Sequence, residues 1–218
     1  MIVTPSSQAD LAGSFSKMRE GLLYGIIGSV LAGASLMFLL FGMLASTASS
    51  GDGGGASALG VLLASVVGVL IGGVLWLWGF YGKFIPGVEE LRKARPEYST
   101  AATLIRIGFI WGLVLVIIGV ILTLILIGIL LVLIGYILLI LGYVGMIILC
   151  FNLNSSEGNS LYLVAGILLI IGIFIPILSF IAYILMYVAL GDAVRKYSTM
   201  QPPPPATPQP SPALPPPV

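Results

Sequence analysis

Residues 107–151 read IGFIWGLVLVIIGVILTLILIGILLVLIGYILLILGYVGMIILCF, an apolar run of 45 residues without a charged side chain. A single α-helix of this length would be about 68 Å long, whereas the hydrocarbon core of a bilayer is about 30 Å thick. The run therefore predicts two membrane-spanning helices, with a turn between Leu122 and Ile127. This pattern predicts an all-α, polytopic transmembrane helical bundle.

The composition of the chain agrees with a membrane protein. Hydrophobic residues make up 59% of the sequence and charged residues 8%, far below the roughly 25% of a soluble domain. The net charge of +1 gives no long-range attraction for nucleic acid, so a nucleic-acid partner is not expected. The bilayer is the predicted partner.

Six apolar stretches are predicted to cross the membrane, between an N-terminal segment at 1–20 and a tail at 197–218. Together they make a membrane domain over 21–196, with spans at about 21–45, 58–81, 103–122, 127–151, 161–175 and 177–191.

The last apolar block, Leu161–Leu190, admits two interpretations. It forms either one long helix kinked at Pro176, for five spans in all, or two short helices that break there, for six. Cytoplasmic loops carry an excess of Lys and Arg, which favours six spans, with both termini on the cytoplasmic side of the cell membrane. Six spans place all nine basic residues on one side, at positions 17, 19, 83, 92, 93, 95, 106, 195 and 196.

Glycines recur at helix-packing intervals within the apolar stretches. Small residues allow helix backbones to approach closely in lipid, where tight packing holds helices together. We therefore predict helix contacts at Gly68, Gly72, Gly108, Gly112, Gly128, Gly135 and Gly142. The alternative is a pore or groove lined by bare backbone.

Four tyrosines fall within the predicted spans: Tyr136, Tyr143, Tyr183 and Tyr187. A phenol hydroxyl at membrane depth requires a hydrogen-bonding partner. We predict interhelical hydrogen bonds to partners such as Ser29, Ser65, Thr123 or Ser179, with substrate contact as the alternative.

The segment between the second and third spans carries most of the charge. A short helix is predicted from Pro86 until Pro96, lying on the membrane surface with its basic end on anionic headgroups. The basic residues assigned to this surface are Arg92, Lys93, Arg95 and Arg106. An ordinary solvated connector is the interpretation favoured over this surface site.

The tail at Ser198–Val218 contains ten prolines, no charge and no glycine. This composition favours an extended polyproline II conformation over a packed domain. A disordered spacer is predicted, which could dock a cytoplasmic partner.

The sequence has no visible catalytic or metal-binding constellation. It contains no histidine and a single cysteine, Cys150, and it lacks metalloprotease, nucleophile-elbow and phosphate-loop motifs. The predicted spans also lack the internal ionisable residue that ion-coupled carriers use. We therefore expect no enzyme activity, no cofactor and no metal.

Three stretches carry a resemblance to a known family: FSKMREGLLY at Phe15–Tyr24, TLIRIGFIWG at Thr103–Gly112 and IAYILMY at Ile181–Tyr187. Over residues 11–197 the chain resembles an archaeal membrane-protein family catalogued as domain of unknown function 973. The resemblance implies an archaeal cytoplasmic membrane, and it brings no activity and no functional residues.

Two functional hypotheses remain from the sequence. The first is a structural, scaffolding or assembly component of the membrane, built as a compact bundle and forming homo- or hetero-oligomers. The alternative is a channel or facilitator for a small or apolar solute.

Overall fold

The computed structural model describes residues 5–48, 54–125 and 127–199, and over these ranges every regular element is helical, without a strand. The prediction of an all-α fold is confirmed. The elements are α1 Pro5–Ala48, α2 Gly54–Gly79, the π-helical η1 Phe80–Phe84, α3 Ile85–Ala94, the 3₁₀ turn η2 Pro96–Tyr98, α4 Ser99–Ile105, the π-helical η3 Arg106–Trp111, α5 Gly112–Ile121, the 3₁₀ turn η4 Leu122–Ile125, α6 Ile127–Glu157, α7 Ser160–Gly172 and α8 Pro176–Thr199.

The second helix is longer than the sequence predicted. Instead of a separate surface helix after Pro86, α2 continues through η1 into α3 and turns only at Arg95, whose backbone is extended. Proline lacks the backbone N–H that would donate to the carbonyl one turn earlier, and its ring crowds that same carbonyl. The wider π-helical turn directly before Pro86 accommodates this interruption, so the helix continues instead of ending.

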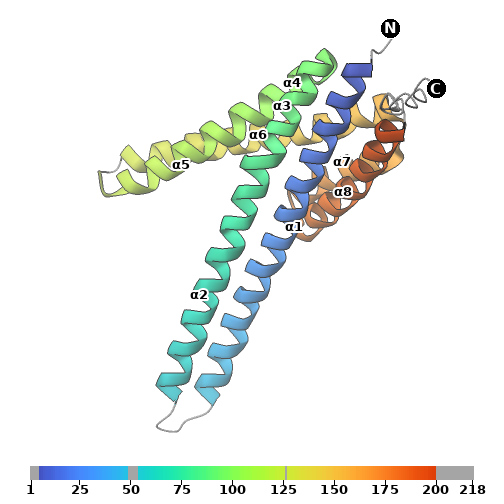
Figure 1. Cartoon of the computed structure of the whole chain (residues 1–218). Coiled ribbons are helices and arrows are strands. Elements are labelled where there is room, and N and C mark those ends of the chain that lie inside the picture. The colour runs from blue at the N-terminus through green and yellow to red at the C-terminus, as the bar shows by residue number, and fades with distance from the viewer. Residues whose placement is uncertain (1–4, 49–53, 126, 200–218) are drawn as a thin grey trace, which may run out of the picture.

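The helices form three antiparallel hairpins that share one end (Figure 1). The first hairpin is α1 with α2–η1–α3, the second is α4–η3–α5 with α6, and the third is α7 with α8. The first and second hairpins diverge from the shared end like the arms of a V (Figure 1). The structure is therefore open, unlike the compact bundle that the sequence suggested.

The helix is interrupted before Pro176: α7 ends at Gly172, and α8 begins at Pro176 after a turn. This break lets α8 return along α7 to the shared end. There the ring of Tyr197 near the end of α8 stacks on Phe15 near the start of α1, with centroids 5.6 Å apart. The two ends of the described chain therefore meet. An even number of antiparallel helices, such as six, returns the chain to the end where it began, whereas five would leave the two ends on opposite sides.

Five of the described helices are long and apolar enough to cross a membrane, and α7 is the short exception. With 13 residues, α7 extends about 20 Å, less than the hydrocarbon thickness. The chain is thus a multi-pass, membrane-type protein whose sixth helix is incomplete as a span.

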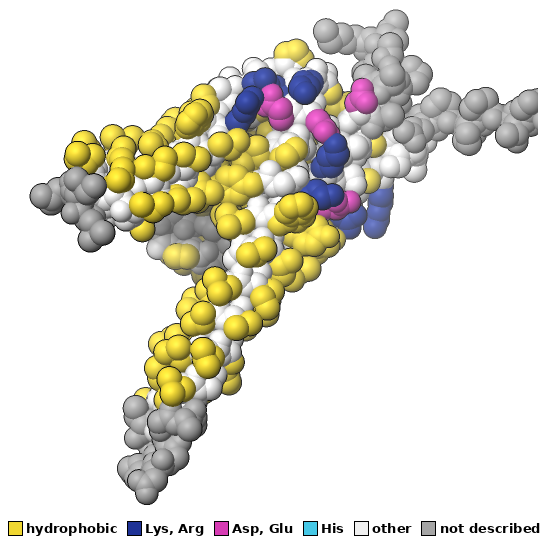
Figure 2. Space-filling view, turned by 60° about the vertical axis from the view of Figure 1, so that its left-hand side comes forward, with side chains coloured by type: hydrophobic (Ala, Val, Ile, Leu, Met, Phe, Trp, Pro, Cys, Tyr) yellow, Lys and Arg dark blue, Asp and Glu magenta, His cyan; other side chains and the backbone are white. Residues whose placement is uncertain are grey.

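The buried core lies at the shared end. Its largest fully buried side chains include Phe15, Phe84, Tyr98, Met146 and Tyr162. The far parts of the first and second hairpins carry exposed apolar side chains, whereas the charged groups gather near the shared end (Figure 2). Exposed apolar helices are stable in lipid, because all their backbone groups are bonded within the helix.

Candidate functional site at the hairpin junction

Glycines on both helices bring the first hairpin together. A Cβ atom added to Gly72 would lie 2.6 Å from the Gly28 carbonyl oxygen and 2.7 Å from the Ala32 amide nitrogen. Gly68, four residues earlier, faces the Ser35 side chain. The α1 and α2 backbones therefore pack in direct contact at Gly72, whereas Gly68 makes room for a side chain of α1.

The second hairpin has the same construction. A Cβ atom on Gly135 would lie 2.9 Å from the Gly112 carbonyl oxygen, and one on Gly142 would lie 3.0 Å from the Phe109 amide nitrogen. Gly108 faces Gly142, and Gly128 faces Gly119. All seven glycines singled out from the sequence thus lie at helix contacts within the two long hairpins.

Four further glycines at helix contacts were not predicted from the sequence: Gly21, Gly28, Gly79 and Gly119. Gly21 and Gly28 in α1 are seven residues apart, as are Gly72 with Gly79 and Gly112 with Gly119. Each of these glycines lies within contact distance of the other helix of its hairpin. Gly128, Gly135 and Gly142 of α6 have the same seven-residue spacing, so this spacing is the sequence signal for the other contact glycines as well.

A crevice of about 410 Å³ lies where the three hairpins separate. The first hairpin contributes Trp76 and Tyr81, the second contributes Phe109 and Tyr143, and the third contributes Ser179. Tyr136, which is 60% exposed, also lines this crevice. The site is an apolar, aromatic cavity with hydroxyl groups in its wall.

The two π-helical segments meet beside this crevice. Phe80 of η1 contacts Phe109 of η3 edge to face, with ring centroids 4.7 Å apart. The Tyr81 hydroxyl donates to the Phe109 carbonyl oxygen across 3.1 Å. Because a π-turn departs from the regular α-helical bonding pattern and is frequent at functional sites, this junction is the most specialised backbone of the fold.

The four predicted tyrosines have different surroundings. The Tyr143 hydroxyl donates to the Leu169 carbonyl oxygen at 2.9 Å and lies 2.8 Å from Ser179 Oγ, which links the second and third hairpins. The Tyr187 hydroxyl accepts from Arg19 at 3.2 Å. Tyr136 lines the junction crevice, and half-buried Tyr183 lines a smaller one between α1, α2 and α8.

A charge network joins three helices at the shared end. The Glu157 side chain is only 3% exposed, and its carboxylate accepts from Arg95 at 3.2 Å, Lys196 at 3.0 Å and the Tyr197 hydroxyl at 2.7 Å. Arg95, one of the basic residues that the sequence assigned to the membrane surface, donates to Glu157 and Tyr197. Desolvation lowers the pKa of Arg95. The interactions with Tyr197, Tyr98 and Glu157 raise the pKa by more than this, so it lies above the usual value for arginine.

The other three predicted surface residues have different positions. Arg92 and Arg106 both approach Glu89 Oε1, at 2.7 Å and 3.8 Å, and line a groove with Thr103 and Trp111. Lys93 lines a separate groove of about 430 Å³ with Asp10, Lys17 and Glu90.

The described side chains offer little for covalent or metal chemistry. Cys150 is buried beside Met186, with 3.8 Å between the sulfur atoms. Within residues 5–48, 54–125 and 127–199, no group of three or more His, Cys, Asp or Glu could hold a metal ion. The junction crevice can surround hydrocarbon or a neighbouring side chain, and its wall also contains hydroxyl groups.

The comparisons with known proteins identify the family of the chain. No curated protein and no solved structure matches it. The family described as protein of unknown function (DUF973) matches residues 12–218, a range that includes the proline-rich tail. The chain therefore belongs to this family of unknown function.

Proposed function

We propose that this protein is a non-enzymatic membrane component that scaffolds or assembles with other membrane helices, either of a second copy or of another protein. The observation that carries this proposal is the junction crevice, which three hairpins line and no described segment fills. Helix association in lipid depends on close packing. An apolar cavity between diverging hairpins provides the surface against which a further helix packs.

A photo-crosslinking experiment tests this assembly role. A photoreactive phenylalanine analogue at Tyr136 lies on the crevice wall, whereas one at Ile137 has the same membrane depth and a matching exposure of 59% against 60%. We expect a protein adduct from position 136 and a much weaker one from position 137. An adduct of twice 22.8 kDa would identify a second copy.

The channel or facilitator hypothesis uses the same crevice. Its aromatic wall suits an apolar solute as well as a helix. A crosslink from position 136 to lipid alone, with no protein adduct, would reject the assembly role and favour this second function.

We further propose that the shared end faces the cytoplasm, because the basic residues gather there (Figure 2), and that both termini of the chain are therefore cytoplasmic. In a Cys150→Ser background, cysteine at Ser50 should react with an impermeant maleimide in intact cells. Cysteine at Ser198 should react only after the cells are opened. Labelling of both positions from the same face would contradict this topology.

The proline-rich tail lies almost entirely outside the described residues, and we propose that it docks a cytoplasmic partner. Deleting residues 201–218 should leave membrane insertion and Tm unchanged, because prolines withhold the backbone donors that regular structure requires. Thermal unfolding of the purified truncated protein measures this. A lowered Tm would show that the tail packs on the helices.

A further inference from the structure

We propose that the groove between α3 and the α4–η3 segment binds the phosphate of an anionic phospholipid. The groove has a volume of about 350 Å³ and is lined by Arg92, Thr103, Arg106, Ile107, Ile110 and Trp111. It joins two guanidinium groups, a hydroxyl and an apolar wall. This site goes beyond the assembly role and does not depend on it.

The two arginines are held close to each other by one carboxylate. Arg92 Nη2 lies 2.7 Å and Arg106 Nη1 lies 3.8 Å from Glu89 Oε1. Arg92 Nη1 also reaches Thr103 Oγ1 at 3.4 Å. Two guanidinium groups that share one carboxylate oxygen keep a net positive charge and leave most of their N–H donors free for a second anion.

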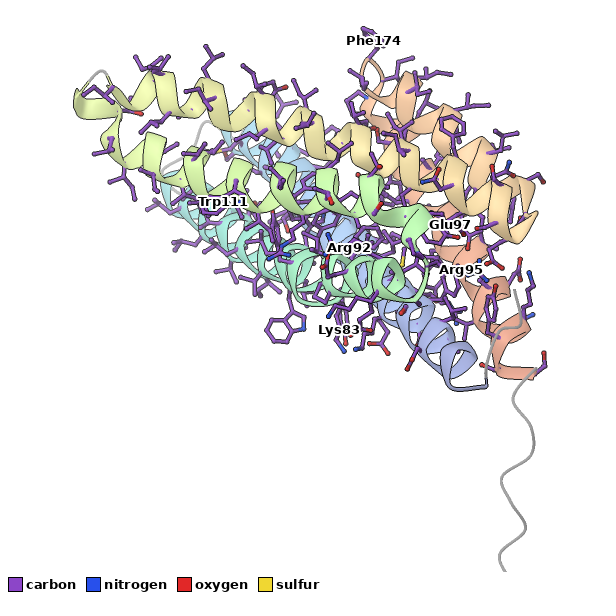
Figure 3. The ribbon with its side chains drawn as sticks, turned by 90° about the horizontal axis from the view of Figure 1, so that it is seen from above. Lys83, Arg92, Arg95, Glu97, Trp111 and Phe174 are labelled. Carbon is purple, nitrogen blue, oxygen red and sulfur yellow. The ribbon has the colours of Figure 1, made fainter. Side chains whose placement is uncertain are left out.

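The apolar half of the groove favours a lipid over a soluble phosphate. Arg106 is the last charged residue before the long apolar run, and Trp111 follows five residues later, at the other end of η3. Trp111 is exposed, and Figure 3 labels it together with Arg92 of α3. Tryptophan is enriched at the membrane–water interface, so phosphate would lie at the arginines and an acyl chain beside Ile107 and Trp111.

The other basic side chains offer weaker candidates. Arg95 is bound to Glu157 and Tyr197, and Lys83 is paired with Glu20 at 2.9 Å. Lys93 lies in a groove that also holds Asp10 and Glu90. The groove at Arg92 and Arg106 combines two cations with an interfacial aromatic ring.

Native mass spectrometry of the full chain in detergent, titrated with phosphatidylglycerol, tests the site. The Arg92→Gln/Arg106→Gln variant should bind this lipid about 30-fold more weakly, since each basic group near a membrane surface contributes roughly fivefold. A matched control, Lys93→Gln/Arg195→Gln, removes the same charge elsewhere at this end and should change binding less than about threefold. Phosphatidylcholine should bind the unaltered protein weakly.

Three results would overturn the proposal. They are equal losses in the two variants, equal binding of the two lipids, and displacement of phosphatidylglycerol by millimolar glycerophosphoglycerol, which would indicate a soluble-anion site. If the glutamine variant does not fold, Arg92→Lys/Arg106→Lys replaces it. Lysine keeps the charge but lacks the two-pronged donor geometry, so a clear loss of affinity in this variant supports the site and unchanged affinity rejects it.

Discussion

Replacing Gly72 with leucine is expected to destabilise the protein by at least about 2 kcal/mol, because the added side chain must push α1 away from α2. Even a single Cβ atom there would lie 2.6 Å from the Gly28 carbonyl oxygen, far inside van der Waals contact. Backbone atoms cannot move aside as a flexible side chain can. Thermal unfolding in detergent should show a clearly lowered Tm.

The neighbouring Gly73 provides a matched control. A Cβ atom at Gly73 would meet nothing within 4 Å, so Gly73→Leu adds the same side chain at the same depth into open space. Because leucine also has a better helix propensity than glycine, we expect an unchanged or slightly raised Tm. Equal losses in both variants would show that added bulk anywhere on α2 is harmful and that the glycine contact is not special.

The second hairpin should respond in the same way. Gly135→Leu would drive a side chain toward the Gly112 carbonyl oxygen and the Val116 amide nitrogen, each 2.9 Å from the added Cβ atom. We expect a lowered Tm or a changed oligomer size on size-exclusion chromatography. A variant with unchanged Tm and unchanged size would show that α5 and α6 can separate without cost.

The sequence was sufficient to predict that the chain is helical, but several helices extend past the predicted spans. The first helix begins at Pro5, the fourth predicted span continues to Glu157, and the last helix continues to Thr199. Uninterrupted apolar runs have only one solution in lipid, since every backbone group must be bonded within its own helix. Pro176 predicted the break that separates α7 from α8, and the charges predicted that α8 returns to the basic end. These features depend on local chemistry and length.

The arrangement of the hairpins could not be predicted in the same way. Leucine and isoleucine suit lipid and a neighbouring helix equally well, so their pattern does not distinguish the exposed far parts of the hairpins from the buried core. The continuation of α2 past Pro86 depends on the π-turn at Phe80–Phe84, and no residue pattern in the sequence predicted this turn. The inward position of Arg95 depends on Glu157, 62 residues away.

The charge network at the shared end should give the second large effect. Arg95→Met is expected to lower the free energy of unfolding by about 3 kcal/mol, because it removes a partner from a carboxylate that is only 3% exposed. Lys196 remains in contact, and Arg95 itself is 24% exposed, which places the loss at the low end for a broken buried pair. Arg195→Met, an exposed neighbour of Lys196, is the control and should have little effect.

A double-mutant cycle separates the charge interaction from the packing of the arginine. Glu157→Gln removes the negative charge but keeps a side-chain oxygen that can accept from the Tyr197 hydroxyl. In this background Arg95→Met no longer removes a partner from a buried charge, so its cost should fall by about half. Equal costs in both backgrounds would mean that Arg95 stabilises the shared end through its packing beside Tyr197 and not through Glu157.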